Sequence, residues 1–193
     1  MPSPVTRPLS ELSPSTAGSV ACRPEDSQIQ SDVMGLYDQL RSPLLRYVLS
    51  FGISIHDGEE VTQEVFLALF RHLQMGKSRR NLRSWLFRVA HNLALKQRHA
   101  NQKSLDRMEL EPAVAAKQLD SSPSPEDQLS AIERRSRLLA VVEALPEEDQ
   151  CCLRLRAEGL RYREISEVVG ISLGAVSLSL TRSLARLIRA DGM

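Results

Sequence analysis

The chain has 193 residues, enough for one or two small domains, and its aromatic content of 4% is low for a β-rich protein. Its formal net charge of +1 does not by itself indicate a nucleic-acid partner, and no apolar run approaches the roughly 20 residues of a membrane span. The three cysteines are odd in number and lack CxxC or Cys/His spacing, so we expect no disulfide framework, no metal and no cofactor. Adjacent Cys151 and Cys152 are expected to pack as small apolar side chains on a helix.

Residues 1–30 are rich in proline and serine, with five prolines in this stretch. They offer too little apolar surface to offset the entropy of folding, which predicts a disordered extension. The stretch also lacks the apolar core of a secretory signal. We therefore expect order to begin near Ser31 and the protein to stay in the cytoplasm without membrane insertion.

Residues 31–100 are expected to form a first helical domain. Ser31 and Asp32 are suitable helix caps. Apolar residues then recur at helical spacing on both sides of Pro43, which can start or kink a helix. The pattern breaks at residues 51–54, and residues 74–81 are predicted to be a loop. Helices are expected over residues 33–49, about 57–73 and 82 to about 99.

Charge is distributed unevenly along this first domain. From Arg71 to Lys103 there are nine Lys or Arg residues and no acid, whereas Tyr47 to Phe70 holds four acids and no Lys or Arg. The near-zero net charge therefore conceals two neighbouring surfaces of opposite sign. The basic block is typical of a protein that binds the phosphate backbone, although a solvated helical face would have the same composition.

A second domain is expected over residues 129–193, after a linker. Residues 101–128 hold prolines, serines and an excess of acids, which predicts a flexible acidic tether. A first helix of the second domain ends at Pro146, and Glu147 to Glu158 is predicted to be the next helix.

The most specific pattern lies between Leu160 and Arg189. A short helix is predicted from Tyr162 to Val169, Gly170 can end it in the left-handed conformation, and Ser172 can cap the next helix. This is the helix-turn-helix arrangement, whose second helix normally enters the major groove of DNA. An ordinary helical hairpin is the structural alternative. The residues expected to point inward are Val176, Leu180, Leu184, Leu187 and Ile188.

Both domains, in this order, resemble the sigma-70 superfamily, and specifically its small extracytoplasmic-function (ECF) type. DGEEVTQEVFLALFRHL, residues 57–73, is similar to the helix of region two, and NLRSWLFRVAHNLALKQRH, residues 81–99, to its promoter-melting helix. Residues 145–187 resemble region four. The resemblance implies an all-α fold of two small helical domains, a region 2 bundle and a region 4 helix-turn-helix, joined by a flexible linker. It implies a subunit that gives RNA polymerase its promoter specificity, recognises and melts the promoter and starts transcription.

The resemblance implies that the acidic helix docks on the clamp helices of the polymerase β′ subunit. Stabilisation of the helix N-terminus would explain Asp57 and Glu59 equally well, but Glu64 poorly. The β flap, promoter DNA and an anti-sigma protein are the other implied partners. The residues implied in polymerase binding are Asp57, Glu60, Gln63 and Glu64.

The resemblance also implies two DNA surfaces. The loop from Gln74 to Arg80 would capture a flipped base. Trp85 could stack on a base, although its place on an apolar stripe favours a core position. The residues implied at the minus-ten element are Lys77, Arg79, Arg80, Arg83, Trp85, Arg88 and Asn92. Those implied at the minus-thirty-five element are Ser172, Leu173, Gly174, Ser177, Leu178, Thr181, Arg182 and Arg186.

The chain departs from the family pattern at three positions. Ser177 and Ser179 stand where the family's recognition helix often has a Lys and an Arg. Fewer cations there predict weaker phosphate attraction and a shallower dependence of binding on salt. Lys96 stands where the family often has Asp, so the usual local contacts at that helix end are not expected.

Two other classes of function compete with this interpretation. The chain could be a stand-alone transcriptional regulator that uses the same helix-turn-helix, with the first domain as a sensor or dimerisation module. An enzyme acting on nucleic acid fits least, because the sequence has no HExxH motif, no Gly-rich phosphate loop and no carboxylate cluster with metal spacing. We therefore expect no enzymatic activity.

Overall fold

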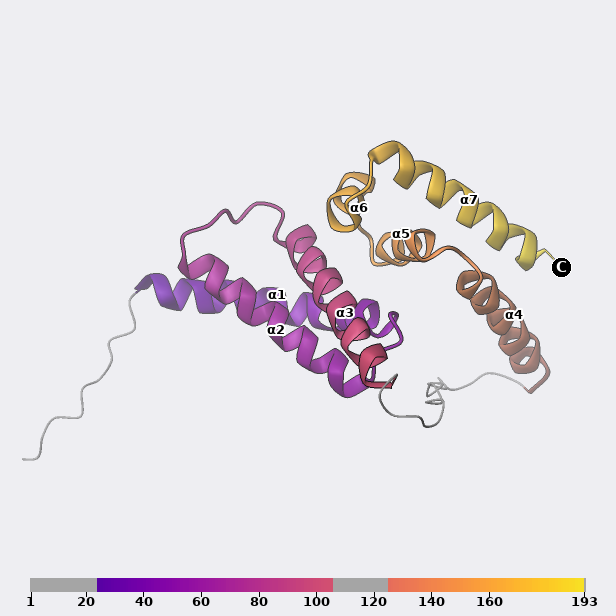
Figure 1. The fold of residues 1–193 in the computed structure, drawn as a ribbon, viewed down its shortest axis with the longest axis horizontal. Helices are drawn as coiled ribbons and strands as arrows, with labels where there is room; N and C mark the ends of the chain where they lie inside the picture. Colours follow the sequence, from indigo (N-terminus) through magenta and orange to yellow (C-terminus); the bar gives the residue numbers. More distant parts are fainter. Residues whose placement is uncertain (1–23, 106–124, 193) are drawn as a thin grey trace, which may run out of the picture.

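The computed structural model describes residues 24–105 and 125–192, and these residues form seven α-helices and no strand. The helices group into two lobes (Figure 1). The all-α fold expected from the sequence is confirmed. The first lobe holds α1 (Pro24–Leu49), α2 (Ile55–Gln74) and α3 (Leu82–Leu105), and the second holds α4 (Pro125–Glu143), α5 (Glu147–Ala157), α6 (Tyr162–Val169) and α7 (Leu173–Asp191).

The first lobe is built on the close packing of α1 against α2, with α3 lying across both (Figure 1). One face of α2 is buried in this packing, and its Val65 and Leu69 are fully buried. Gly58 lets the two helices approach, because a Cβ atom at this position would lie 2.7 Å from Leu49 Cδ2. Ser54 caps α2 by accepting a hydrogen bond from the Asp57 amide at 3.1 Å. The predicted break between the first two helices is thus confirmed.

The predicted start of order at Ser31 is wrong, because α1 already begins at Pro24. Ser31 and Asp32 lie inside this helix and do not cap it. The isolated apolar residue Ile29 is only 7% exposed and joins the core, a contact that a polar stretch of sequence did not reveal. Pro43 lies within α1 without ending it. The rest of the expected extension, residues 1–23, is outside the described residues.

The boundaries predicted for the linker are also wrong at both ends. Helix α3 continues to Leu105, and α4 begins at Pro125, so only residues 106–124 of the expected linker are outside the described part of the chain. The extension of α3 has a tertiary cause. Asn101 donates a hydrogen bond to Asp57 Oδ2 at 2.9 Å, which fastens the polar end of α3 to the start of α2.

The second lobe contains the predicted helix-turn-helix. Helix α6 has the predicted bounds, and Gly170 adopts the left-handed conformation with φ of 81°. Ser172 caps α7 by accepting a hydrogen bond from the Ala175 amide at 3.1 Å. The chain bends by 105° between the two helices, within the range typical of this motif. These features confirm the helix, turn and capped helix expected from the sequence.

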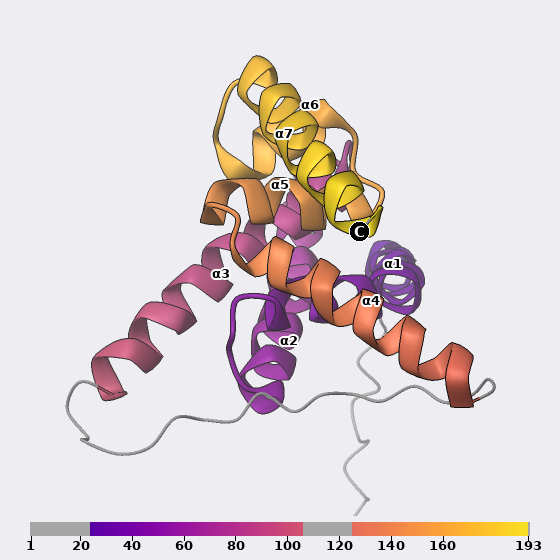
Figure 2. The same cartoon turned by 90° about the vertical axis from the view of Figure 1, so that its right-hand side faces the viewer.

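Part of the inward face predicted for α7 is wrong. Val176 and Leu180 are buried, but Leu184 is 46% and Ile188 72% exposed. Toward its C-terminal end, α7 lies beside α4, and an ion pair joins Asp191 to Arg134 of that helix (Figure 2). A single crossing helix covers less surface than α5 and α6 cover together, and the apolar side chains beyond its reach remain in contact with solvent.

The two lobes contact each other through α3 and α6. The buried apolar residues of both lobes form one connected cluster, from Leu44 and Phe87 in the first lobe to Cys151 and Ile165 in the second. The sequence predicted two domains joined by a flexible linker, and that prediction did not include a core shared by both lobes. Among the described helices, none is by itself long and apolar enough to cross a membrane, and α6 with α7 meets those criteria only as a sharply bent pair.

Candidate protein and nucleic-acid interfaces

Helix α2 exposes three of the four residues expected to bind polymerase. Glu60, Gln63 and Glu64 are all exposed and occupy neighbouring positions on one side of the helix. His56 lies 3.4 Å from Glu60 one turn earlier and is itself exposed. The outer surface of α2 therefore carries two carboxylates and an amide that a partner can reach.

Asp57 differs from the other three residues, because its carboxylate is engaged within the lobe. It accepts the hydrogen bond from Asn101, and this bond is the main reason that the pKa of Asp57 lies below its usual value. Its backbone amide donates to Ser54. The structure therefore gives Asp57 a clear task in joining the start of α2 to the end of α3.

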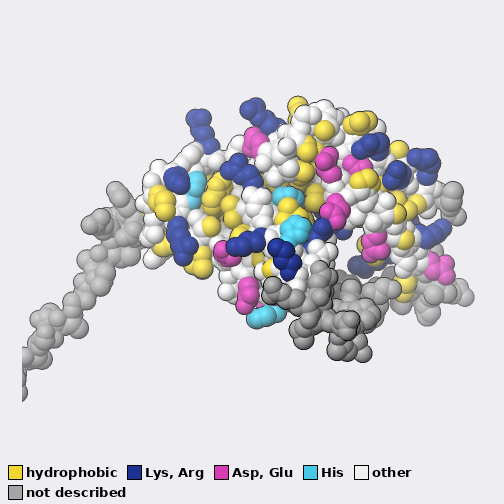
Figure 3. Space-filling view, viewed as in Figure 1, with side chains coloured by type: hydrophobic (Ala, Val, Ile, Leu, Met, Phe, Trp, Pro, Cys, Tyr) yellow, Lys and Arg dark blue, Asp and Glu magenta, His cyan; other side chains and the backbone are white. Residues whose placement is uncertain are grey.

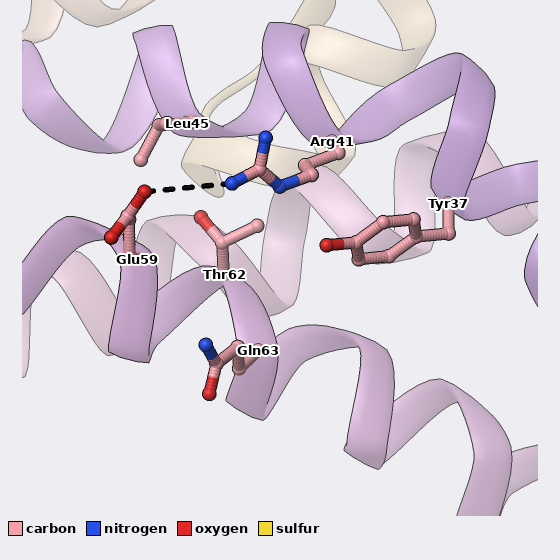
Figure 4. Close-up of a pocket in the computed structure, with 6 residues that line it drawn as sticks. All are labelled: Tyr37, Arg41, Leu45, Glu59, Thr62 and Gln63. Carbon is pink, nitrogen blue, oxygen red and sulfur yellow. Dashed lines mark hydrogen bonds and ion pairs between the residues drawn. The ribbon is translucent and has the colours of Figure 1, made fainter.

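An apolar groove runs beside the acidic residues, between α1 and α2. It has a volume of about 380 Å³, and Leu67 on its wall is 55% exposed. Close to the groove, Arg41 of α1 reaches toward Glu59 of α2 at 3.5 Å, beside Tyr37 and Gln63 (Figure 4). Sequence periodicity missed this groove because its walls come from two helices. The residues that line it are Val33, Tyr37, Gln63, Phe66, Leu67 and Phe70.

The loop between α2 and α3 is held at defined points. His72 Nε2 lies 3.0 Å from the Ser78 carbonyl oxygen, and the His72 ring packs on Trp85 at 4.6 Å between centroids. Arg79 forms an ion pair with Asp32 of α1. Sequence reasoning missed both anchors, since Asp32 is 47 residues from its partner. Lys77 and Arg80 are exposed, and Figure 3 shows Lys and Arg side chains projecting above this part of the first lobe.

Helix α3 is covered at its first turn and exposed farther along. Arg88, Asn92 and Lys96 follow one another at intervals of four residues and are all exposed. In the first turn, Arg83 donates a hydrogen bond to the Glu158 carbonyl oxygen and Ser84 donates to Glu167 at 3.3 Å. The residues expected at the minus-ten element are therefore divided between an exposed row and the first turn, which contacts the second lobe.

Trp85, in the first turn of α3, is neither fully exposed nor fully buried. It is half-buried and packs against the core of the first lobe, as the apolar stripe suggested. Its contact with His72 joins the start of α3 to the end of α2, directly below the loop. This position supports the loop whether or not the indole also reaches a base.

Helix α7 exposes the residues expected at the minus-thirty-five element, from Ser172 to Arg186. Arg182 is not free, because its guanidinium lies 3.2 Å from Asp149, a carboxylate of α5 that is only 3% exposed. Ser179 is 1% exposed. The expectation that both Ser177 and Ser179 replace DNA-facing cations is therefore wrong for Ser179, which lies toward the core.

The contact between the lobes combines ion pairs with buried polar groups. Arg46 of α1 donates two hydrogen bonds to Glu158, at 3.1 and 2.8 Å, and this pairing raises the pKa of Arg46. Arg154 of α5 donates to the Ser50 carbonyl oxygen at 2.7 Å, and burial lowers its pKa. Arg98 pairs with Glu147 at 2.8 Å. The first lobe thus supplies two arginines that pair with carboxylates of the second lobe, and the second lobe supplies one arginine that donates to a backbone carbonyl of the first.

Tyr47 lies at the centre of this contact and is 1% exposed. Its hydroxyl oxygen is 2.8 Å from Nδ1 of His91. Burial and the neighbouring Cys151 raise the pKa of Tyr47, and burial also raises the pKa of the Cys151 thiol. Cys151 and Cys152 are buried and unpaired, which confirms the apolar packing expected for them.

Two known families match the chain, and their matches follow the two lobes. Sigma-70 region 2 matches residues 36–104, and Sigma-70, region 4 matches residues 135–187, so together they cover well over half of the chain. The chain belongs to the sigma-70 family. Region 2 thus extends from α1 to α3, and region 4 extends from α4 to α7.

Several relatives of this sigma-70 family member are named as ECF sigma factors, and the chain is of that type too. It is 31% identical over 133 residues to the ECF RNA polymerase sigma factor SigE of Mycolicibacterium smegmatis, covering 68% of the chain and 51% of the relative. It is 27% identical to the ECF RNA polymerase sigma-E factor of Escherichia coli K12, covering 66% of the chain and 70% of the relative. The chain thus spans about half the length of the mycobacterial relative.

A solved structure shares the fold of this sigma-70 family member. It is a co-crystal structure of the sigma factor RpoE with the anti-sigma factor NepR from Bartonella quintana, matched at 15% identity with a TM-score of 0.60. The match covers 83% of this chain and 96% of the other. At this identity, the likeness concerns the arrangement of helices. Sigma factors are transcription initiation factors rather than enzymes by themselves.

Proposed function

We propose that the chain is a sigma factor, a dissociable subunit that binds core RNA polymerase, recognises and melts a promoter and starts transcription there. The observation that carries this proposal is the juxtaposition of three surfaces on the two matched regions. These are an acidic and apolar surface on α2, a basic loop and helix face at α2–α3, and an exposed recognition helix in α7. The chain itself catalyses no step of RNA synthesis.

The α2 surface is the proposed docking site for the polymerase. Carboxylates repel the phosphates of DNA, so the exposed Glu60 and Glu64 favour a protein partner with basic groups. The adjacent groove offers the apolar centre that a stable interface needs, with exposed Leu67 as an anchor. A pair of helices, such as the β′ clamp helices, supplies both a ridge for the groove and cations for its rim. Asp57 contributes mainly by fixing the start of α2.

The loop and the free face of α3 are the proposed minus-ten surface. Lys77, Arg80 and Arg88 are exposed cations that can meet phosphates, and Asn92 on the same helix face can reach a base edge. Arg79 is held by Asp32 and serves to position the loop. Arg83 becomes available only when the second lobe moves away from α3.

In the closed structure, the contact between the lobes keeps the two proposed DNA surfaces too close together to reach both promoter elements. Two DNA surfaces that read elements about 25 base pairs apart must stand on the order of 80 Å apart along the duplex, at about 3.4 Å per base pair. Lobes that share one core cannot span that distance. The lobes must separate before promoter binding, and core polymerase supplies the binding energy for this separation.

The remaining proposed partners bind the same two lobes. Exposed Leu184 and Ile188 on α7 form an apolar surface for the polymerase β flap. An anti-sigma protein is also proposed, with support from the relative whose structure contains the anti-sigma factor NepR. Its contacts would cover surfaces needed for polymerase binding. The proposed site of action is the cytoplasm, where the polymerase works.

Charge reversal on α2 tests this proposal. The double variant Glu60→Lys, Glu64→Lys is expected to lose binding to core polymerase in a pull-down while keeping its helical circular dichroism spectrum. The matched control reverses two exposed acids of the second lobe, Glu143→Lys and Glu148→Lys, and is expected to bind. Retained binding by the α2 variant would overturn the docking assignment.

A stand-alone transcriptional regulator is the alternative function, and DNA binding in the absence of polymerase distinguishes it from a sigma factor. A regulator of that kind binds duplex DNA tightly without polymerase, whereas the closed contact between the lobes predicts weak specific binding by the isolated chain. A nanomolar footprint of the chain alone on a specific duplex would favour the regulator. A footprint that appears only with core polymerase would favour the sigma factor.

A further inference from the structure

The first two turns of α7 carry no charged side chain, although this is the part of a recognition helix that meets base edges. Its two largest exposed side chains are Leu173 at 54% and Leu178 at 57%. The first charge along the helix is Arg182, and Asp149 of α5 holds that guanidinium. The face offered to a duplex by these two turns is therefore mainly apolar.

Two of the hydroxyl groups on this face are engaged by the helix backbone, and the exposed side chain of Ser177 is the small polar group beside them. Ser172 Oγ accepts a hydrogen bond from the Ala175 amide at 3.1 Å, and Thr181 Oγ1 donates to the Ser177 carbonyl oxygen at 2.8 Å. Asn and Gln are absent from the helix. The face therefore lacks the amide and guanidinium groups that make paired hydrogen bonds to adenine and guanine.

The geometry around the two leucines fits a DNA duplex. The chain bends by 105° after Gly170, and Leu173 and Gly174 at the start of α7 are exposed. A helix about 10–12 Å wide fits a major groove of about 12 Å. Arg161 and Arg163 are exposed at the start of α6, where they can meet the phosphates beside the groove. Figure 3 shows further Lys and Arg side chains over this lobe.

We propose that Leu173 and Leu178 read the 5-methyl groups of thymines in the upstream promoter element. The thymine methyl is the one apolar group that a base pair presents in the major groove, and contact with it removes apolar surface from water on both sides. The chain would thus select A·T steps at positions where a cationic helix selects guanine. This inference rests on the proposed function, because it assigns chemistry to the same recognition helix.

Replacing thymine by deoxyuridine tests the inference, since it removes only the methyl group. A promoter is first selected by holoenzyme, core polymerase with the full chain, from a library with a randomised upstream segment. Its upstream thymines are then replaced one at a time by deoxyuridine. The loss of each methyl that a leucine reads is expected to weaken holoenzyme binding by about fourfold, which corresponds to about 0.8 kcal/mol for one buried apolar carbon. Equal binding of the thymine and deoxyuridine promoters would overturn the inference.

Two variants assign the effect to its residue. Leu178→Ala is expected to weaken binding to the thymine promoter and to lose sensitivity to deoxyuridine at one position. Leu139→Ala, the same substitution at an α4 leucine that is 48% exposed and lies outside every proposed interface, is expected to keep full sensitivity. Sensitivity that persists in Leu178→Ala would overturn the assignment of that residue.

Other outcomes separate this inference from the proposed function. If no library member is selected and no transcript starts with holoenzyme, the sigma-factor proposal fails. If transcripts start but the selected upstream segments lack thymine, only the inference fails. A free chain that changes from oligomer to monomer in Leu178→Ala would mean that the leucines form a protein contact, and this too would overturn the inference.

Discussion

At the scale of single residues, the lobe contact depends on polar groups whose state is set by burial. His91 is 8% exposed and lies beside the hydroxyl of Tyr47. Burial disfavours the charged imidazole and lowers the pKa of His91 below its ordinary value of about 6.5. The neutral ring is therefore part of the folded state.

We predict that this burial makes stability depend on pH. The contribution of His91 is fully present above about pH 6.5, the unfolded value, and is lost as the pH falls toward its lowered folded pKa, because the unfolded chain takes up a proton first. The loss from one group is at most about 1.4 kcal/mol per pH unit. Urea unfolding between pH 7.5 and 5.5 measures it, and His91→Gln should show a shallower slope. Identical slopes would exclude His91 as the titrating group.

Arg182 is a residue for which structure changed the sequence interpretation. Its exposure on α7 was predicted, but its partner Asp149 lies 33 positions earlier in the chain, beyond any local pattern. The family resemblance likewise compared Ser179 with a cation of the recognition helix, but this side chain is buried against the core. Sequence periodicity shows which residues share one side of a helix. Which of these residues another helix covers depends on tertiary packing, and periodicity does not contain that information.

We expect Arg182→Ala to destabilise the second lobe. The change leaves the Asp149 carboxylate buried without its charged partner, which costs about 1–3 kcal/mol of unfolding free energy. Thermal or urea unfolding measures the loss. Arg186→Ala removes an exposed arginine of the same helix and is expected to change stability by less than about 0.5 kcal/mol. Equal stability of the two variants would show that the pair contributes little.

At the scale of elements, the sequence was most informative where local chemistry decides the structure. The bounds of α6, the left-handed Gly170 and the Ser172 cap all follow from nearby residues, and all were predicted. The start of α1 and the apolar groove beside α2 were missed, because each depends on packing between distant segments. The exposed apolar residues in the C-terminal half of α7 were also missed, since their exposure depends on how far α4 reaches.

The groove makes an element-scale prediction about α2. Leu67→Asp places a charge on its exposed apolar wall and is expected to weaken binding to core polymerase by at least about tenfold, a typical cost at the centre of an interface. Ile55→Asp is the matched control, because Ile55 is 56% exposed on the same helix, outside the groove, against 55% for Leu67. Affinity measured by fluorescence titration distinguishes them. Equal affinities would mean that the groove is not part of the interface.

At the scale of the whole molecule, the two lobes form one body closed by ion pairs. Arg46 donates two hydrogen bonds to the Glu158 carboxylate, and the backbone carbonyl of Glu158 also accepts one from Arg83. The sequence predicted two lobes and a tether but not this contact, because neither lobe shows a pattern that specifies the other. Because this contact holds the two proposed DNA surfaces close together, we expect the chain alone to bind DNA weakly.

We predict that Glu158→Arg shifts the free chain toward an open form. The substitution replaces an attraction to Arg46 by repulsion, so small-angle scattering should report a larger radius of gyration. Glu148→Arg, an exposed acid without a partner across the lobe contact in the described structure, should leave the radius unchanged. An unchanged radius in Glu158→Arg would mean that apolar packing alone keeps the lobes together.

The central claim is that this chain gives core RNA polymerase a promoter specificity that neither has alone. Mapping transcript start sites on genomic DNA in vitro, with core polymerase in the presence and absence of the purified chain, tests it most directly. We predict discrete new start sites only when both are present, each preceded by two shared sequence blocks. Unchanged start sites, together with specific duplex binding by the chain alone, would contradict the claim.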